Sequence, residues 1–276
     1  MIYRRVEDWD DAYANGPNIP GGDRWPGLWA EQAKAFRDKL SAKGRMKLDL
    51  SYGDRPRNRF DLFLPEGEPK GLVVFVHGGY WVRLDKSLWS HLAGGSLARG
   101  HAVAMPSYTL CPDIRISGIV TEVAAAIEAA ARMIGGPIRL AGHSAGGHLI
   151  SRMVTTSAPL SQDVQRRIVS SVSISGLHDL RPLMNIVANA DLKIDREEAM
   201  AESPALLEPM AGARLACWVG AGERAEFIRQ NGLLANIWTG LGAWTSVVEE
   251  PDRHHFNVID GLADPDHALT RTLLTG

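Results

Sequence analysis

Apolar and polar residues alternate in the first part of the chain and then gather into continuous apolar runs. Residues 46–52 (MKLDLSY) and 59–64 (RFDLFL) alternate with a period of two, which predicts an antiparallel pair of strands at the edge of a sheet. Residues 71–76 (GLVVFV) are apolar throughout, as expected of a central strand that is buried on both faces. These three segments predict the first strands of one sheet.

After residue 84, predicted helices alternate with predicted strands. The helices are expected at 84–99, 118–134, 145–156, 225–238 and 266–274, and the strands at 102–105, 138–141, 168–174, 215–220 and 244–249. Strands that alternate with helices build a parallel sheet with helices on both faces. The pattern therefore predicts one α/β domain over residues 1–276, with a mostly parallel, eight-stranded sheet.

Two segments fall outside this alternation. Residues 1–45 form an arm rich in aromatic side chains, which we expect to end in a short helix near 28–40. Residues 178–210 have mixed polarity and contain prolines at 182, 204 and 209, so we interpret them as a small cap inserted between two strands.

Composition and charge exclude several classes of function. The 276 residues are 45% hydrophobic and 22% charged, with a formal net charge of -2, so no strong field would recruit nucleic acid or an anionic membrane. The start of the chain lacks the apolar run of a secretory signal and no later run is long enough to span a membrane, so we expect a cytoplasmic protein. Cys111 and Cys217 lack the spacing of a zinc site and are interpreted as buried apolar residues.

A candidate nucleophile lies in the stretch LAGHSAGGHL at 140–149. Gly142, Ser144 and Gly146 form the pattern G-x-S-x-G between a predicted strand and a predicted helix, which is the context of a nucleophile elbow. The turn is tight, so small flanking residues are required and the hydroxyl of Ser144 is exposed above the sheet. Strand and helix on either side make this pattern far more specific than the five letters alone.

Backbone amides that could stabilise an oxyanion are expected at two places. Ala145 begins the helix after the serine, where an amide has no partner within the helix. The loop after the central strand reads HGGYW, and its glycines let the backbone approach a reacting carbon, so the amides of Gly79 and Tyr80 are the other expected donors.

A serine hydroxyl needs a histidine base, which in this arrangement follows late in the chain. His254 and His255 follow the predicted strand 244–249, and the residues alone do not choose between them, whereas His267 is expected inside the last helix at the surface. The acid that orients the base is expected at Glu223, after the preceding strand, with Asp179 as the rival.

Several motifs together resemble the kynurenine formamidase, or arylformamidase, branch of the α/β-hydrolases. They are YAN at 13–15, HGGYW at 77–81, GHSAGG at 142–147, SGLHDL at 175–180, GERAEFIRQ at 222–230 and HFNVI at 255–259. The resemblance implies an α/β-hydrolase fold with Ser144 as nucleophile and His255 as base. The acid falls on Glu223, where better known members have aspartate, and this departure indicates a subgroup with a different substrate.

The resulting hypothesis is a serine hydrolase that cleaves an aryl formamide or a related small ester through an acyl-enzyme, without metal or cofactor. A carboxylesterase of broad range and a non-catalytic receptor with the same fold are the alternatives. We expect a small aromatic substrate as the partner, with neither nucleic acid nor membrane; a homodimer is compatible with the sequence but not specified by it. The side chains expected to contact the substrate are Tyr80, Trp81, His143, Trp25 and Trp29.

Overall fold

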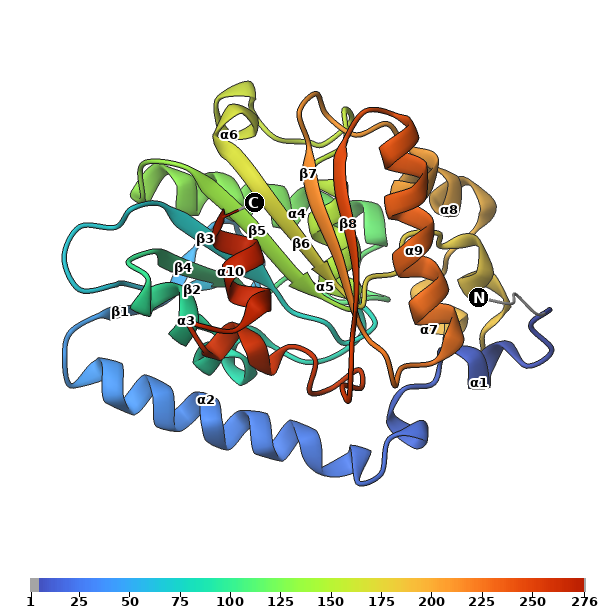
Figure 1. The fold of residues 1–276 in the computed structure, drawn as a ribbon, viewed down its shortest axis with the longest axis horizontal. Helices are drawn as coiled ribbons and strands as arrows, with labels where there is room; N and C mark the ends of the chain where they lie inside the picture. The colour runs from blue at the N-terminus through green and yellow to red at the C-terminus, as the bar shows by residue number, and fades with distance from the viewer. Residues whose placement is uncertain (1–4, 276) are drawn as a thin grey trace.

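The computed structural model describes residues 5–275, and its eight strands form one mixed sheet (Figure 1). The strands are β1 (Met46–Ser51), β2 (Arg59–Phe63), β3 (Leu72–Val76), β4 (Ala102–Pro106), β5 (Ile138–His143), β6 (Ile168–Ile174), β7 (Arg214–Gly220) and β8 (Trp244–Glu250). Their order is β1-β2-β4-β3-β5-β6-β7-β8, and only β1–β2 and β2–β4 pair antiparallel. The predicted sheet is confirmed, including the antiparallel pair at its edge.

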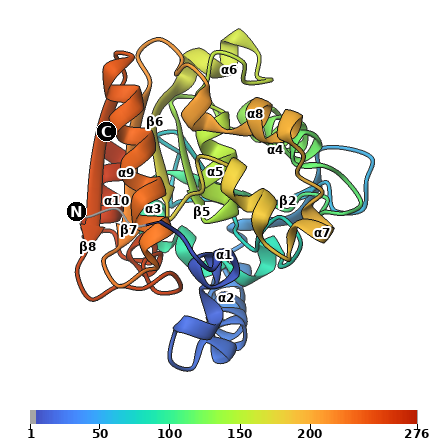
Figure 2. The same cartoon turned by 90° about the vertical axis from the view of Figure 1, so that its right-hand side faces the viewer.

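The two faces of the sheet carry separate hydrophobic cores. Alternate residues of β3 point to opposite faces, so Leu72 and Val74 join one core while Val73 and Phe75 join the other. The helices that cover the first core are α4 (Ile116–Met133), α5 (Ala145–Arg152) and α9 (Ala225–Gly240). The second core is covered by α2 (Trp25–Ser41), α3 (Gly94–Ala98) and α10 (Ala268–Thr275), and Figure 2 shows the two layers from the side.

The helix predicted at 84–99 is wrong, because the segment is broken into three short pieces. They are η3 (Lys86–Leu88), η4 (Ser90–Ala93) and α3. The carboxylate of Asp85 accepts from the amide of Ser87, and the ammonium of Lys86 is buried against Asp61 (2.8 Å), which fixes the chain in a turn. A Cβ atom at Gly95 would lie 2.6 Å from the carbonyl oxygen of Leu262, so this end packs directly on backbone.

The aromatic arm lies along the outside of the domain before entering β1. Its elements are α1 (Trp9–Tyr13), η1 (Gly16–Asn18), η2 (Gly22–Arg24) and α2, which begins three residues earlier than predicted, with Pro26 in its first turn. Trp29, Ala33 and Leu40 on one face of α2 are buried. Figure 1 shows the arm passing from α1, beside α9, to the long helix α2 under the sheet.

The segment 178–210 forms four short helical elements between β6 and β7. They are η5 (Arg181–Asn185), α7 (Asn189–Leu192), α8 (Arg196–Glu202) and η6 (Pro204–Leu206). A further short helix that the pattern did not predict, α6 (Gln162–Arg167), precedes β6. Within residues 5–275 no helix is long and apolar enough to cross a membrane, and Cys111 and Cys217 are both buried as predicted.

Candidate active site

Ser144 lies in the sharp turn between β5 and α5, with a strained backbone. Its φ of 56° and ψ of -118° lie in a region that side chains with a Cβ atom rarely adopt. Glycine is required on both sides of the turn. A Cβ atom would lie 2.1 Å from the carbonyl oxygen of Gly146 if it stood at Gly142, and 2.0 Å from that of Val76 if it stood at Gly146. The predicted elbow geometry is therefore present.

The loop after β3 lies directly against this turn. A Cβ atom at Gly78 would be 3.0 Å from the Cβ of Ser144, so the loop can approach so closely only with glycine there. The next three residues, Gly79, Tyr80 and Trp81, have φ values of 116°, 51° and 57°. The carbonyl of Gly79 accepts from the amides of Val82 and Arg83, which turns the loop back on itself. Gly79 and Tyr80 line the same cavity as Ser144, and Ala145 begins α5.

His255 and Glu223 form a buried pair between two loops. Nδ1 of His255 lies 2.6 Å from Oε2 of Glu223, and the two side chains are 5% and 0% exposed. The other carboxylate oxygen of Glu223 accepts from the hydroxyl of Ser175 (2.5 Å) and the amide of Gly220 (2.9 Å). Three donors thus fix the carboxylate, and the carboxylate in turn holds the imidazole ring in one orientation.

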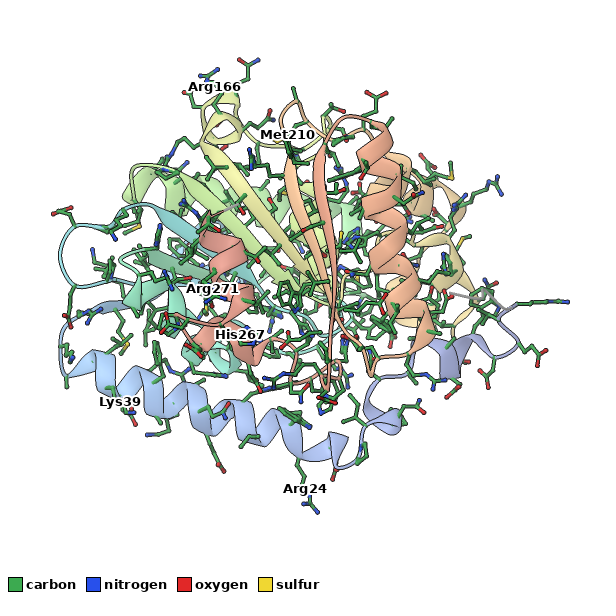
Figure 3. The ribbon with its side chains drawn as sticks, viewed as in Figure 1. Arg24, Lys39, Arg166, Met210, His267 and Arg271 are labelled. Atoms are coloured by element: carbon green, nitrogen blue, oxygen red, sulfur yellow. The ribbon has the colours of Figure 1, made fainter. Side chains whose placement is uncertain are left out.

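The alternatives for base and acid lie elsewhere. Both carboxylate oxygens of Asp179 accept from the guanidinium of Arg181 (2.9 and 2.8 Å). The ring of His254 packs edge-on against Trp25, with centroids 5.2 Å apart. His267, labelled in Figure 3, precedes α10 instead of lying inside it, so that prediction is wrong by one residue. Its Nε2 lies 3.3 Å from Oε1 of Glu250.

A cavity of about 750 Å³ opens at the serine turn. Ser144, His255 and the loop after β3 line one part of it; we call residues 77–84 the oxyanion loop, after the role expected from the sequence. Trp29, Trp89 and Phe256 give the cavity an aromatic wall. Most of the remaining lining comes from the arm, between Tyr13 and Pro26, and none comes from segment 178–210. The arm therefore supplies about half of the residues that line this cavity.

Three of the five side chains predicted to contact substrate line this cavity. Tyr80, His143 and Trp29 do so, whereas Trp25 and Trp81 do not. The left-handed backbone of Trp81 turns its side chain into the core, where it is fully buried against His148 with ring centroids 5.2 Å apart. Trp25 packs behind Trp29, one turn away on the same helix. Sequence reasoning missed Asn15, Arg83, Trp89 and Phe256 as cavity-lining residues. Asn15 and Phe256 lie inside the motifs YAN and HFNVI, Arg83 lies two residues after HGGYW, and Trp89 has no such signal.

Hydrogen bonds anchor the arm to the rest of the site. The hydroxyl of Tyr80 donates to the carbonyl of Tyr13 (2.5 Å), and the hydroxyl of Tyr13 donates to the buried carboxylate of Glu226 (2.8 Å). On the other side, Gly16 approaches the ring of Phe256. The arm thus spans from the oxyanion loop to the loop that carries His255.

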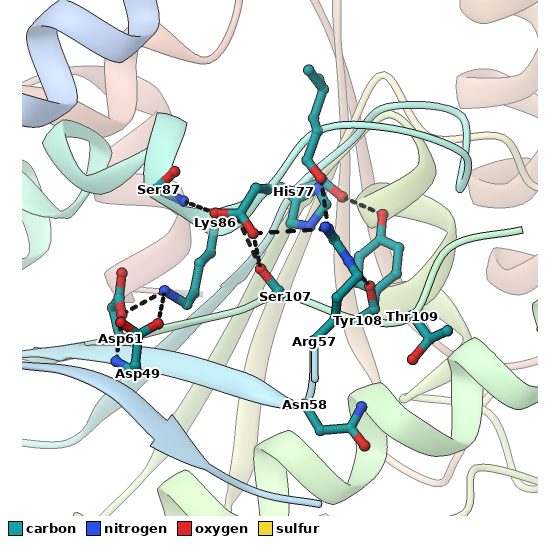
Figure 4. A network of polar contacts seen from close by, with 12 residues as sticks. Asp49, Arg57, Asn58, Asp61, His77, Lys86, Ser87, Ser107, Tyr108 and Thr109 are labelled. Atoms are coloured by element: carbon teal, nitrogen blue, oxygen red, sulfur yellow. Dashed lines mark hydrogen bonds and ion pairs between the residues drawn. The ribbon is translucent and has the colours of Figure 1, made fainter. Parts of the chain in front are cut away.

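A polar network from the first hairpin supports the oxyanion loop (Figure 4). The guanidinium of Arg57 donates to the carbonyls of Leu84 (2.6 Å) and Tyr108 (2.7 Å), and the hydroxyl of Tyr108 donates to the carbonyl of His77 (3.0 Å). His77 and Leu84 lie at the two ends of this loop. Arg57 therefore contacts one end of the loop directly, at Leu84, and the other end, at His77, through Tyr108.

The second half of this network is a buried ammonium. Nζ of Lys86 lies 2.8 Å from both Asp49 and Asp61, and these bonds raise the pKa of Lys86 against the opposing effect of burial. Asp85 accepts from the hydroxyl of Ser107 (2.8 Å), which joins the two halves. A buried salt bridge adds little net stability, and its main effect here is to hold the segment after the oxyanion loop in one conformation.

Two buried histidines beside the serine are held neutral. Burial lowers the pKa of His77 to about 4, and burial followed by repulsion from His255 lowers the pKa of His143 well below its usual value. Nε2 of His143 donates to the carbonyl of His255 (2.8 Å) and so positions its loop. No cluster of three or more His, Cys, Asp or Glu side chains suited to a metal ion occurs in the part of the chain that the structure describes.

Comparison with known proteins places this arrangement among hydrolases. The family model named BD-FAE matches residues 60–214. Kynurenine formamidase of Danio rerio is 28% identical over 252 residues, which cover 87% of this chain and 85% of that protein. The crystal structure of a candidate thioesterase from Silicibacter sp. TM1040 is 49% identical, with a TM-score of 0.92, and covers 97% of this chain and 99% of its own.

A more distant solved structure bears on the fold alone. Esterase B from Lactobacillus rhamnosis is 17% identical, with a TM-score of 0.66 over 92% of each chain. Such solved neighbours confirm the α/β-hydrolase fold, and the Danio rerio protein confirms the resemblance that the motifs carry.

Proposed function

This chain belongs to the BD-FAE family of α/β-hydrolases, and from that premise we propose a serine hydrolase that cleaves aryl formamides or related small esters. The observation that carries the proposal is the buried pair of His255 and Glu223, in which His255 lines the same cavity as Ser144. An imidazole held by a carboxylate serves as a general base for a serine hydroxyl.

The proposed reaction proceeds in two steps. His255 accepts the proton of Ser144 while the hydroxyl oxygen attacks the substrate carbonyl, and the amides of Gly79, Tyr80 and Ala145 stabilise the oxyanion. The imidazolium then protonates the leaving amine or alcohol, which leaves an acyl-enzyme. Water, activated by the same imidazole, hydrolyses the acyl-enzyme and regenerates Ser144.

Two features favour an aryl leaving group. The cavity has an aromatic wall of Trp29, Trp89 and Phe256, and rings pack favourably on such a surface. Its volume exceeds the needs of a formyl group alone, so the space suits a large leaving group beside a small acyl group. The similarity to kynurenine formamidases supports the same choice.

Turnover tests the proposal. We expect the protein to hydrolyse an activated aryl acetate, and the Ser144→Ala variant to lose this activity. A comparison of kcat/KM for N-formylkynurenine and for short-chain aryl esters then separates a formamidase from a broad carboxylesterase, since only a formamidase prefers the amide. Wild-type protein that turns over neither class would refute the enzyme and favour a receptor.

The 49% identity to a candidate thioesterase supports one second candidate. A thioester carbonyl reacts through the same acyl-enzyme, so an aryl thioacetate belongs in the same panel of substrates. A kcat/KM for the thioester far above that of the matched oxygen ester would shift the proposal to a thioesterase.

A further inference from the structure

Glu250, the last residue of β8, has a carboxylate that takes no part in the proposed bond cleavage. Its side chain is 12% exposed and does not line the cavity. Oε2 accepts from the indole nitrogen of Trp218 on β7 (2.6 Å), and Oε1 accepts from the guanidinium of Arg253 (3.1 Å). Hydrogen bonds to an ionised acceptor are among the stronger ones in proteins. The carboxylate therefore joins β7 to residues 251–259, which carry His255 and which we call the base loop.

A third segment approaches the same carboxylate. Nδ1 of His267 accepts from the amide of Leu269 (3.2 Å), so the ring proton lies on Nε2. That nitrogen lies 3.3 Å from Oε1 of Glu250. Because His267 directly precedes α10, the single carboxylate contacts β7, the base loop and the residue before α10.

Arg253 connects this carboxylate to the residues around the acid. Arg253 lies two residues before the base, and its carbonyl accepts from the amide of Gly222 (2.9 Å). Gly222 directly precedes Glu223 in the chain. Next to this bond, the amide of Ala221 donates to the carbonyl of Glu250 (2.8 Å). The side chain of Arg253 is thus held by Glu250, while its backbone contacts the segment that carries the acid.

We propose that Glu250 is a positioning residue that, through Arg253, keeps the base within hydrogen-bond distance of the acid. The bond between His255 and Glu223 is 2.6 Å long, and its two partners lie on different loops, which move more easily than strands. A carboxylate at the end of β8 that is bonded to β7 ties the base loop to the rigid sheet and limits this movement. The inference rests on the proposed function, because it adds a residue to the same acid–base pair.

Glu250→Gln tests this role in the hydrolysis of an activated aryl acetate. The amide nitrogen of glutamine would face one of two donors, Trp218 or Arg253, so one of the bonds is lost. We expect kcat to fall about tenfold with KM near the wild-type value, because the base shifts while the rest of the cavity wall does not. Glu249→Gln is the matched control, since it removes the same charge from the preceding residue, which is exposed on the other face of β8. An equal kcat in all three proteins, or an equal fall in both variants, would overturn the role.

A second variant separates positioning from a general loss of stability. Arg253→Gln removes the other partner of the bond, at a side chain that is 33% exposed, where substitution costs little stability. Because the two side chains act as one unit, we expect the same fall in kcat. The double variant Glu250→Gln/Arg253→Gln should then be no slower than either single variant. Losses that multiply in the double variant would show two independent effects and overturn the proposal.

Proton NMR of the resting protein distinguishes failure of this role from failure of the proposed function. A proton between Nδ1 of His255 and a carboxylate oxygen at 2.6 Å resonates far downfield of ordinary amide protons, and Glu223→Gln identifies the signal by its loss. We expect Glu250→Gln to move this signal upfield or to broaden it by exchange with water, and Glu249→Gln to leave it unchanged. Wild-type protein that shows the signal but hydrolyses neither class of substrate would refute the hydrolase alone. An unchanged signal in Glu250→Gln, or its absence from the wild type, would overturn the positioning role.

Discussion

Nδ1 of His255 lies 2.6 Å from the carboxylate of Glu223, a contact between loops that are 32 residues apart in the chain. The second oxygen of the same carboxylate is already occupied by Ser175 and Gly220. Oε1 of Glu223 is therefore occupied, and Oε2 is the oxygen that contacts the imidazole. The backbone on either side of β7's end packs on the loop that carries His255, since a Cβ atom at Gly220 or Gly222 would lie 2.5 or 3.1 Å from the carbonyl oxygen of Arg253.

Replacement of this carboxylate tests its role in orienting the base. In Glu223→Gln the amide offers a weaker acceptor and can donate instead, which favours the wrong tautomer of His255. We expect kcat to fall by about 10²- to 10⁴-fold with little change in KM.

Asp179→Asn is the control for Glu223→Gln. It removes the rival carboxylate, which pairs with Arg181, and should leave kcat near the wild-type value. A normal kcat in Glu223→Gln together with a large loss in Asp179→Asn would reverse the assignment of the acid.

The strained backbone of Ser144 predicts that removal of its Cβ atom stabilises the protein while activity is lost. In Ser144→Gly the Cβ that opposes a φ of 56° is absent, whereas Ser144→Ala keeps it. Relief of such strain is worth roughly 1–3 kcal/mol, which exceeds the entropic cost of a new glycine of about 0.5–1 kcal/mol. We expect both variants to be inactive, with the glycine variant more resistant to denaturant by about 1 kcal/mol. Equal stability of the two would mean that the turn holds no strain.

The contacts of Arg57 predict that a residue outside the cavity controls catalysis. Arg57→Gln loses the bonds to the carbonyls of Leu84 and Tyr108, so the oxyanion loop is less firmly positioned. We expect kcat to fall about tenfold with KM nearly unchanged, because loss of one positioned donor lowers transition-state stabilisation. Arg55→Gln is the control, since Arg55 is exposed and its ion pair with Glu122 is long, at 3.6 Å. A similar fall in both variants would indicate a general charge effect.

Buried histidines predict a loss of stability in acid. Burial lowers the pKa of His77, His91 and His101 to about 4, and that of His148 and His178 to about 3. Between these values and the unfolded value near 6.5, the unfolded chain binds protons that the folded chain does not. Each of these groups lowers the free energy of unfolding by at most about 1.4 kcal/mol per pH unit as the pH falls below 6.5.

Asp260 acts in the opposite direction. Burial raises its pKa to about 6, so the stability that it contributes is present at low pH and is lost as the pH rises through 6. The histidines outnumber it, and we expect Tm to fall steeply from pH 6.5 to pH 5 and to be nearly flat from pH 7 to pH 8. His178→Gln should make the acid limb shallower. A constant Tm down to pH 5 would contradict neutral buried imidazoles.

The sheet was predictable because burial on both faces imposes a signal on neighbouring residues. β3 and β6 are continuous apolar or small runs. The first four residues of β2 alternate in sequence, although β2 pairs on both sides and four of its five residues are buried. The segment at 84–99 was not predictable in the same way. Lys86 leaves the helical pattern to reach Asp49 and Asp61, which lie 37 and 25 positions earlier in the chain, and such a tertiary ion pair overrides local propensity.

The residues of the site also fall into those that local sequence predicts and those that tertiary packing places. The serine elbow and the glycines of the oxyanion loop are local motifs, so the sequence locates them. Which tryptophan lines the cavity depends on the side-chain direction: Trp25 and Trp29 are one helical turn apart, and only Trp29 contacts the cavity. The left-handed backbone at Tyr80 and Trp81 directs the side chain of Trp81 into the core, and no local sequence pattern predicts this backbone conformation.

The docking of the arm predicts that a residue outside the oxyanion loop affects substrate binding. The hydroxyl of Tyr13 donates to Glu226 (2.8 Å) and accepts from Gln230 (3.2 Å), and both bonds are buried. Tyr13→Phe removes them, and Glu226 keeps its pair with Arg229 (2.7 Å), so we expect a loss of about 1–2 kcal/mol in stability. Because the arm forms much of the cavity wall, a looser arm should also raise KM several-fold while kcat changes little.

Ser161→Ala separates this effect from a general loss of stability. Ser161 caps α6, far from the cavity, and its hydroxyl accepts from the amide of Val164 (3.3 Å). Loss of such a cap destabilises a protein by about 1 kcal/mol, a change comparable to that expected for Tyr13→Phe. The control should keep the wild-type KM, because α6 contributes nothing to the cavity. If KM rose equally in both variants, the arm would have no specific part in binding, and the cavity wall would depend on the stability of the whole domain.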